Sequence, residues 1–73
     1  MKLSDFSLEV MEQAYYEPTH IGAMAARLGA EKSDVAEAVR VLQRLNLMTV
    51  EALTRVVRIT PAGKIWVESG RTR

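Results

Sequence analysis

The spacing of apolar residues changes abruptly at Asn46. Before it, residues 33–45 form the strongest helical pattern of the chain, with apolar side chains recurring every three or four positions. After it, residues 47–51 and 55–60 are rich in Val, Ile, Thr and Leu at a spacing near two, which is typical of strands. The change predicts a helix followed by an antiparallel β-hairpin. The expected buried face of the helix consists of Val35, Ala38, Val39, Leu42 and Leu45.

A second helical pattern covers residues 4–16, near the start of the chain. Ser4 or Ser7 can cap this helix, and Pro18 follows its end, where it pushes the preceding residue out of helical geometry. The expected inward positions are Phe6, Val10, Met11, Ala14 and Tyr15.

A third, shorter pattern covers residues 22–28, with Ala25 and Leu28 as inward positions and Met24 beside them. Gly29 ends it, because glycine tolerates the left-handed conformation that closes many helices. Residues 30–32 then form a tight turn into the helix 33–45. For the cap of that helix, the sequence offers a capping box of Asp34 and Glu37, or else Ser33 or Glu31.

The end of the chain adds a short fourth helix. Residues 52–54 are the expected hairpin loop, and Thr60-Pro61 starts the helix, with threonine as cap and proline in the first turn. Gly70 is expected to end the helix, leaving residues 71–73 as a basic tail. One face of this fourth helix is expected to carry Ala62, Ile65, Trp66 and Ser69.

Length and composition predict a single domain over residues 1–70. A chain of 73 residues supplies one core, because it buries only about 60% of its unfolded surface. The chain has no cysteine, which excludes a disulfide framework and a thiolate metal site and favours a cytoplasmic setting. No apolar run approaches the roughly 18 residues of a membrane span, so neither a signal peptide nor a membrane partner is expected.

The net charge of +1 hides an uneven distribution. Residues 1–20 carry a formal charge of −3, residues 21–54 are neutral, and residues 55–73 carry +4. A local basic surface steers an anionic partner more strongly than the total charge does. Any such partner is therefore expected to meet mainly the C-terminal third.

The order helix, helix, tight turn, helix, hairpin resembles the winged helix-turn-helix family over residues 6–68. The resemblance rests on the segments 21–29 (IGAMAARLG), 35–42 (VAEAVRVL) and 45–48 (LNLM). The segment 59–63 (ITPAG) is similar to the step from strand to helix in small bacterial and archaeal regulators of the multiple-antibiotic-resistance type. The expected fold is therefore mostly α, a three-helix core with a two-stranded wing and a short C-terminal helix.

This resemblance implies a small transcriptional regulator that binds double-stranded DNA. Such modules place the second helix of the pair in the major groove, and the hairpin lies along the adjoining backbone. In this chain those surfaces correspond to Lys32, Ser33, Asp34, Ala36, Glu37, Arg40 and Arg44 on the helix, and Arg55 and Arg58 on the hairpin.

Two acidic residues leave an alternative open. Asp34 and Glu37 lie where phosphates would repel a carboxylate, unless it accepts a hydrogen bond from a cytosine amino group. They favour a winged-helix module that binds a protein through its acidic first helix or its third helix. Single-stranded nucleic acid is a weaker alternative, because the few aromatic residues have core-like spacing.

The fourth helix offers candidates for self-association. Trp66 is the only tryptophan, and it is expected either to pack on the first helix or to mediate contact between two copies. Ile65 and Trp66 are therefore the candidate residues of a homodimer, in which paired modules would read paired half-sites.

Catalytic chemistry finds no support in this sequence. The lone His20 has no cysteine and no second histidine for a metal site or triad. Gly22 and Gly29 lack the spacing of a phosphate-binding loop. The sequence therefore predicts a binding module without a cofactor and not an enzyme.

Overall fold

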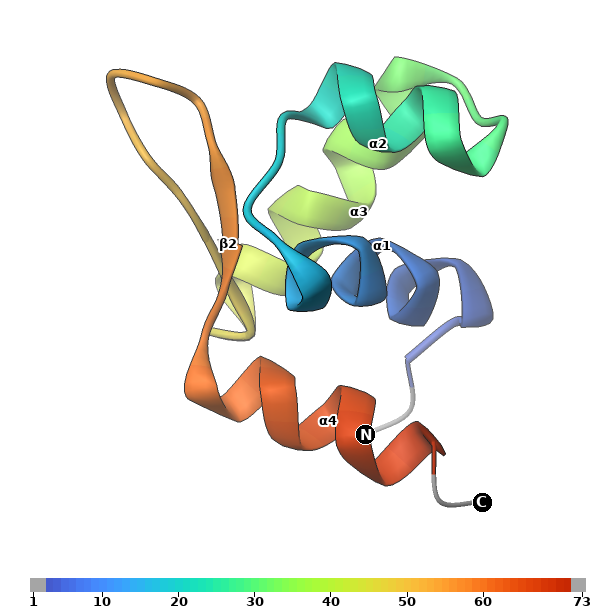
Figure 1. Cartoon of the computed structure of the whole chain (residues 1–73), viewed down its shortest axis with the longest axis vertical. Helices are drawn as coiled ribbons and strands as arrows, with labels where there is room; N and C mark the ends of the chain where they lie inside the picture. Colours follow the sequence, from blue (N-terminus) through green and yellow to red (C-terminus); the bar gives the residue numbers. More distant parts are fainter. Residues whose placement is uncertain (1–2, 72–73) are drawn as a thin grey trace.

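The computed structural model describes residues 3–71, which form four helices and one hairpin (Figure 1). In chain order the elements are α1 (Asp5–Tyr16), α2 (Ile21–Leu28), α3 (Lys32–Arg44), β1 (Met48–Val50), β2 (Val57–Ile59) and α4 (Pro61–Arg71). The order confirms the predicted fold class, a mostly helical chain with a small β-hairpin.

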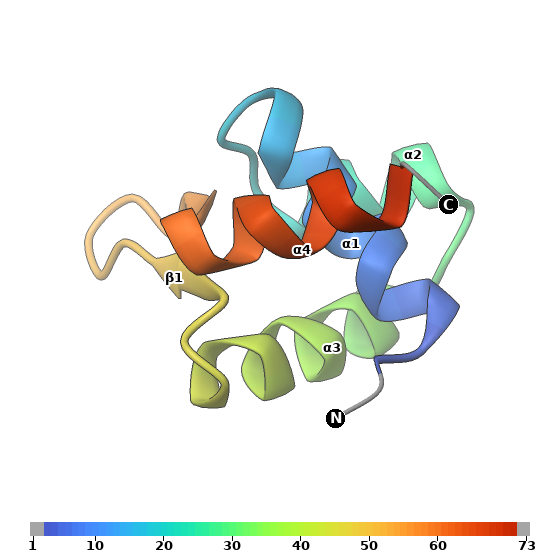
Figure 2. The ribbon, with the colours of Figure 1, turned by 90° about the horizontal axis from the view of Figure 1, so that it is seen from below.

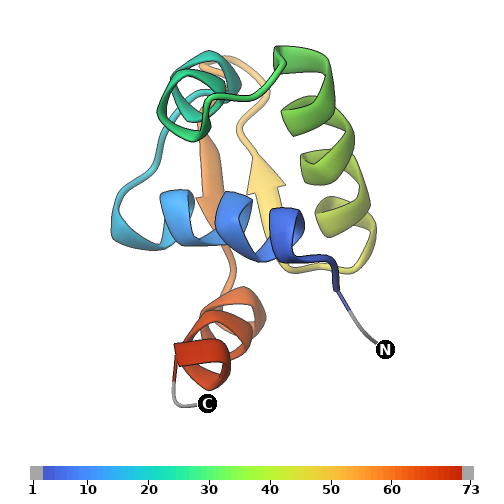
Figure 3. The ribbon, with the colours of Figure 1, turned by 90° about the vertical axis from the view of Figure 1, so that its right-hand side faces the viewer.

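Helix α1 lies between α4 on one side and α2 on the other (Figures 1 and 3). Ser4 caps it as predicted, because its Oγ accepts a hydrogen bond from the Ser7 backbone N–H at 3.1 Å. The apolar face of α1 packs against α2, α3, α4 and β2. The buried core is formed by Val10, Met11, Ala14, Met24, Ala25, Val35, Ala38, Val39, Leu42, Leu47, Met48, Val57 and Val67.

The turn between α2 and α3 forms at the predicted glycine. Gly29 has φ 62°, and its N–H bonds back to the last carbonyls of α2. Helix α3 starts at Lys32, one residue earlier than expected, with Glu31 as its cap residue and no side-chain cap bond. The predicted capping box is wrong, because Glu37 accepts a hydrogen bond from Arg40 at 2.9 Å instead of capping the helix.

The hairpin is shorter than the sequence predicted. Its strands pair antiparallel in the register Met48–Ile59, Thr49–Arg58 and Val50–Val57. Strand β2 does not begin at Arg55, because that residue has φ 61°, a left-handed conformation incompatible with a strand. Its N–H bonds to the Glu51 carbonyl at 2.8 Å, so Arg55 closes the loop that the sequence had assigned to residues 52–54.

A third segment joins the hairpin. Thr19, in the turn between α1 and α2, forms an antiparallel bridge with Val57 through two backbone hydrogen bonds of 2.8 and 3.2 Å. The sequence analysis did not predict this contact. It fixes the hairpin to the start of α2.

The two ends of the hairpin meet in one junction, where α3 ends and α4 begins. Asn46 leaves α3 in a left-handed conformation with φ 61°, as its position predicted. Thr60 donates its hydroxyl to the Asn46 carbonyl at 2.8 Å and donates its N–H to the Leu47 carbonyl at 3.1 Å. The same hydroxyl accepts from the Gly63 N–H at 3.1 Å, which confirms Thr60 as the cap of α4.

Helix α4 lies over α1 when the molecule is seen from below (Figure 2). Its inward residues are Gly63, Val67 and the half-buried Trp66. Of the residues predicted to share one face of α4, Trp66 is half-buried, while Ala62, Ile65 and Ser69 are exposed. The helix packs closely at Gly63, where a side chain would run into the Leu47 carbonyl and the Ile59 side chain.

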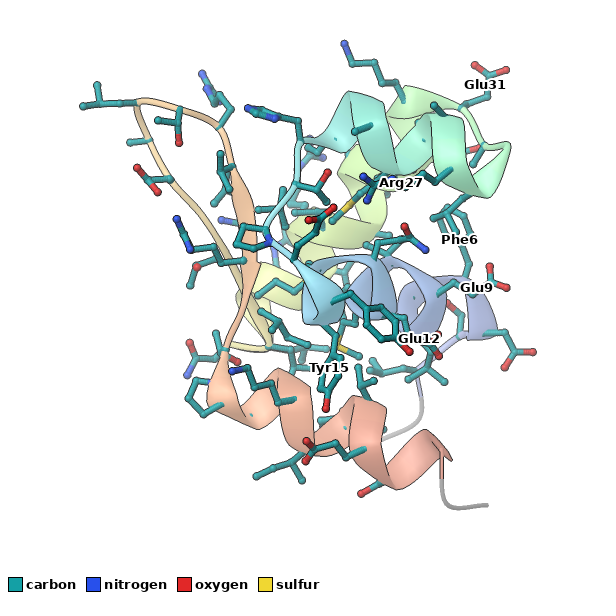
Figure 4. All side chains as sticks on the ribbon, in the orientation of Figure 1. Phe6, Glu9, Glu12, Tyr15, Arg27 and Glu31 are labelled. Carbon is teal, nitrogen blue, oxygen red and sulfur yellow. The ribbon has the colours of Figure 1, made fainter. Side chains whose placement is uncertain are left out.

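Two further details of α4 bear on the predictions. The helix continues through Gly70 to Arg71, so the expected stop at Gly70 is wrong; the last two residues of the predicted tail lie outside the described residues. Tyr15 points from α1 toward α4, as Figure 4 shows, and its hydroxyl donates to a Glu68 carboxylate oxygen at 2.9 Å. Of the two tyrosines of α1, Tyr15 is the one that packs on the core.

The two glycines of α4 provide a matched test of the junction. We expect Gly63→Ala to lower the free energy of unfolding by about 2 kcal/mol, because the added methyl group overpacks the contact with Leu47 and Ile59. Gly70→Ala should instead raise it by about 0.5 kcal/mol, because open space surrounds that position and alanine favours a helix. Urea unfolding of both variants measures the difference. Equal stabilities would contradict the close packing at Gly63.

Candidate nucleic-acid interface

A groove runs between α3, the start of α2 and the hairpin. We call it the wing groove. It is open to solvent beside the hairpin that projects next to α2 and α3 in Figure 1. The residues that matter for its chemistry are Lys32, Ser33, Ala36 and Arg40 from α3, and Val50 and Arg55 from the hairpin.

The period of α3 decides which side chains reach this groove. Lys32, Ala36 and Arg40 follow one another at intervals of four and so share one face of the helix. Asp34 and Glu37 lie on another face, where they line a second groove with Val41. We call this the N-terminal groove; its remaining lining residues are Leu3, Ser4, Phe6, Ser7 and Ala38. Asp34 thus lies away from the wing groove, whereas Glu37 borders both grooves, because its carboxylate contacts Arg40.

The two arginines of the hairpin lie on different sides of it. Arg55 lines the wing groove beside Val50. Because successive side chains of a strand point to opposite faces, Thr49 and its cross-strand partner Arg58 lie on the other face of the hairpin. Arg58 pairs there with Glu51, whose carboxylate oxygen lies 3.5 Å from the arginine Nε. The other predicted arginine, Arg44, is exposed at the end of α3 and lines neither groove.

His20 connects the wing groove to the hairpin tip. It is the cap residue of α2, yet its side chain makes no cap bond. Its Nε2 atom instead lies 3.0 Å from the Thr54 carbonyl oxygen in the hairpin loop. No local sequence pattern predicts this contact, because the two residues lie 34 positions apart in the chain.

The cations of the wing groove differ in how they are paired. Within residues 3–71, Lys32 and Arg55 form no ion pair. Arg40 lies 2.9 Å from a Glu37 carboxylate oxygen, an exposed pair three residues apart on the helix. Such a pair contributes about 0.5 kcal/mol or less, so a phosphate can replace the glutamate at little cost. Glu51 also lines the groove, and its carboxylate oxygen forms an exposed ion pair with Arg58 at 3.5 Å.

The candidate dimerisation residues lie elsewhere. Ile65 on α4 is 64% exposed, while Trp66 packs partly on the core. Helix α4 is on the far side of α1 from α2 (Figures 1 and 3). A second copy that bound α4 would therefore leave the wing groove open.

Residues 3–71 offer neither a metal-binding cluster nor a membrane-spanning helix. These residues contain no group of three or more histidine, aspartate or glutamate side chains placed to hold a metal ion. No helix there combines the length and the apolar composition that crossing a membrane requires.

Comparison with known proteins gives no match to a family model and none to a curated protein sequence. Solved structures do match. The transcriptional regulator BldR from Sulfolobus solfataricus superposes with a TM-score of 0.88 at 23% identity, over 99% of this chain and 55% of BldR. A MarR/EmrR family transcriptional regulator from Acinetobacter sp. gives a TM-score of 0.86 at 14% identity, over 96% of this chain and 51% of the regulator.

MepR, a transcription regulator of the Staphylococcus aureus multidrug efflux pump MepA, gives a TM-score of 0.86 at 16% identity. The match covers 96% of this chain and 55% of MepR. The chain thus spans about half the length of each of these three regulators. At these identities the likeness concerns the fold. Over nearly its whole length, the chain has the winged helix-turn-helix fold of MarR-type regulator structures, which confirms the resemblance found in the sequence.

Proposed function

We propose that this chain is the DNA-binding part of a transcriptional regulator, with α3 in the major groove of a duplex and the hairpin on the adjoining backbone. The observation that carries the proposal is the sorting of charge around α3. Lys32, Arg40 and Arg55 line the wing groove, while Asp34 and Glu37 line the N-terminal groove. The main objection from the sequence, two carboxylates facing phosphates, is thereby reduced, because Asp34 lines the other groove and Glu37 is paired with Arg40. Glu51 also lines the wing groove, and its carboxylate lies 3.5 Å from Arg58 Nε.

Five residues of the wing groove have matching partners on DNA. Lys32 and Arg40 are suited to phosphate oxygens or to the O6 and N7 atoms of guanine, and Ser33 to a phosphate or a base edge. Ala36, between them on α3, can contact a thymine methyl group. Arg55 is unpaired and projects from the hairpin, where it is suited to a phosphate or to the minor groove.

The solved structures support the same proposal. BldR and MepR are both described as transcription regulators, and this chain has their fold over almost its entire length. Winged helix-turn-helix modules use the third helix and the hairpin for DNA. In this chain those are the elements that border the wing groove.

Salt dependence of duplex binding tests the proposal, with Arg55→Ala and Arg58→Ala as a matched pair. The wild-type chain should bind a fluorescent duplex, and the logarithm of its binding constant should fall linearly with the logarithm of the salt concentration. The slope should be about −0.9 for each phosphate contact. Arg55→Ala should weaken binding and reduce that slope by about 0.9, because it removes one contact. Arg58→Ala should change the slope little, because that side chain is on the opposite face of the hairpin. Equal losses in both variants would contradict the assignment of the groove.

Arg55→Gly separates the charge from the loop conformation. Arg55 holds a left-handed φ that costs a non-glycine residue about 1 kcal/mol, whereas glycine adopts it freely. We expect this variant to bind DNA as weakly as Arg55→Ala does, and to unfold at a higher urea concentration than the wild type. Restored binding in the glycine variant would mean that the loop conformation matters and the guanidinium does not.

The N-terminal groove favours a second candidate function, the binding of a protein. It combines the apolar side chains of Leu3, Phe6 and Val41 with the carboxylates of Asp34 and Glu37. Such a surface suits a helix or strand with apolar and basic residues. Absence of duplex binding at low salt, or a salt slope near zero, would favour this candidate over DNA.

We also propose that two copies associate through Ile65 and Trp66. Two modules on half-sites about 34 Å apart would multiply the few base contacts that one α3 can make. In sedimentation runs at rising protein concentration, the wild-type chain should shift toward the mass of a dimer. Ile65→Glu should stay monomeric, because it places a charge in the apolar contact. The control Leu53→Glu, at the hairpin tip, should associate like the wild type; a wild-type monomer at every concentration would contradict the proposal.

A further inference from the structure

Leu53 sits at the tip of the hairpin loop with 95% of its surface exposed. The other large apolar side chains exposed within residues 3–71 are Tyr16, Val41 and Ile65, and each has a smaller exposed fraction than Leu53. A single exposed leucine is common on protein surfaces. What distinguishes Leu53 is its place between the end of β1 and Arg55, at the outermost point of the element that borders the wing groove.

The loop that carries Leu53 is held by several hydrogen bonds. The Arg55 N–H donates to the Glu51 carbonyl at 2.8 Å, and the Glu51 N–H donates to the Val56 carbonyl at 2.9 Å. Next to Leu53, the Thr54 carbonyl lies 3.0 Å from His20 Nε2. The loop is thus fastened both across the hairpin and to the start of α2. Leu53 is presented outward and does not fold back on the core.

We propose that Leu53 is an apolar wedge that enters the minor groove of the duplex held by the wing groove. The inference rests on the proposed function. With α3 in the major groove, the hairpin tip extends across the phosphate backbone to the neighbouring minor groove. Apolar side chains that enter a minor groove pack on sugars and base edges and partly unstack a base step. Leu53 supplies such a side chain.

The charges around the tip fit a nucleic acid. Arg55, two residues from Leu53, is a cation without an ion pair among the described residues, and it suits the negative potential of the minor groove. Glu51 is the acidic residue nearest the tip in sequence, and it forms an exposed ion pair with Arg58. A wedge flanked by a free cation matches an anionic duplex better than it matches a neutral apolar surface.

The test measures both affinity and base unstacking. The probe is an A·T-rich duplex of about two helical turns, with fluorescein at one end and 2-aminopurine at a TA step. Binding of the wild-type chain should raise the 2-aminopurine fluorescence, because unstacking relieves its quenching. Leu53→Ala should lower affinity on the order of tenfold and abolish the rise. The salt slope of this variant should equal that of the wild type, because no charge is lost.

Two further variants serve as controls. Leu53→Met keeps a large apolar side chain and should restore both affinity and the fluorescence rise. Tyr16→Ala removes an exposed aromatic side chain at the end of α1, outside both grooves, and should leave the unstacking signal at the wild-type level. If the wild type binds with a steep salt slope and Leu53→Ala matches it in affinity and fluorescence, the wedge is refuted and the proposed function stands. If the wild type does not bind the duplex at low salt, the proposed function fails and the wedge fails with it.

Discussion

The hairpin can serve as part of a binding surface because it is fastened to the helices at three levels. At its base, Thr60 binds the Asn46 and Leu47 carbonyls, and Gly63 lets α4 approach that junction closely. At mid-height the Thr19–Val57 bridge attaches it to the segment before α2, and at the tip the Thr54 carbonyl meets His20. A hairpin of two three-residue strands is marginal when isolated. These attachments fix its direction relative to α3.

A fixed hairpin makes the two sides of α3 chemically different. The side toward the hairpin collects Lys32 and Arg40, and Arg55 joins them from the loop. The other side carries Asp34 and Glu37 next to apolar residues of the chain start. The near-zero charge of the central segment therefore conceals two surfaces of opposite character. The first matches the proposed duplex, and the second matches the alternative, a basic and apolar protein partner.

Local signals in the sequence predicted most of the fold. Ser4, Gly29, Asn46 and Thr60 act as caps or stops because each of them satisfies the backbone at a helix end, where neighbours in sequence suffice. The contact of His20 with the loop and the close approach of Gly63 to Leu47 depend on residues distant in the chain, so no local pattern predicts them. The separation of Lys32 from Asp34 was accessible, because intervals of four place Lys32, Ala36 and Arg40 along one helix face and Asp34 lies off that face. Glu37, three residues before Arg40, borders that face and contacts the arginine.

The most direct test of the account is a titration of the isotopically labelled chain with a short duplex, followed by backbone amide chemical shifts. Binding through the wing groove predicts large shifts at Ser33, Ala36 and Arg55, with Val41 and Ile65 unchanged. Shifts that cluster instead around Val41 and Phe6 would contradict it, because they would put the duplex in the N-terminal groove beside the carboxylates of α3.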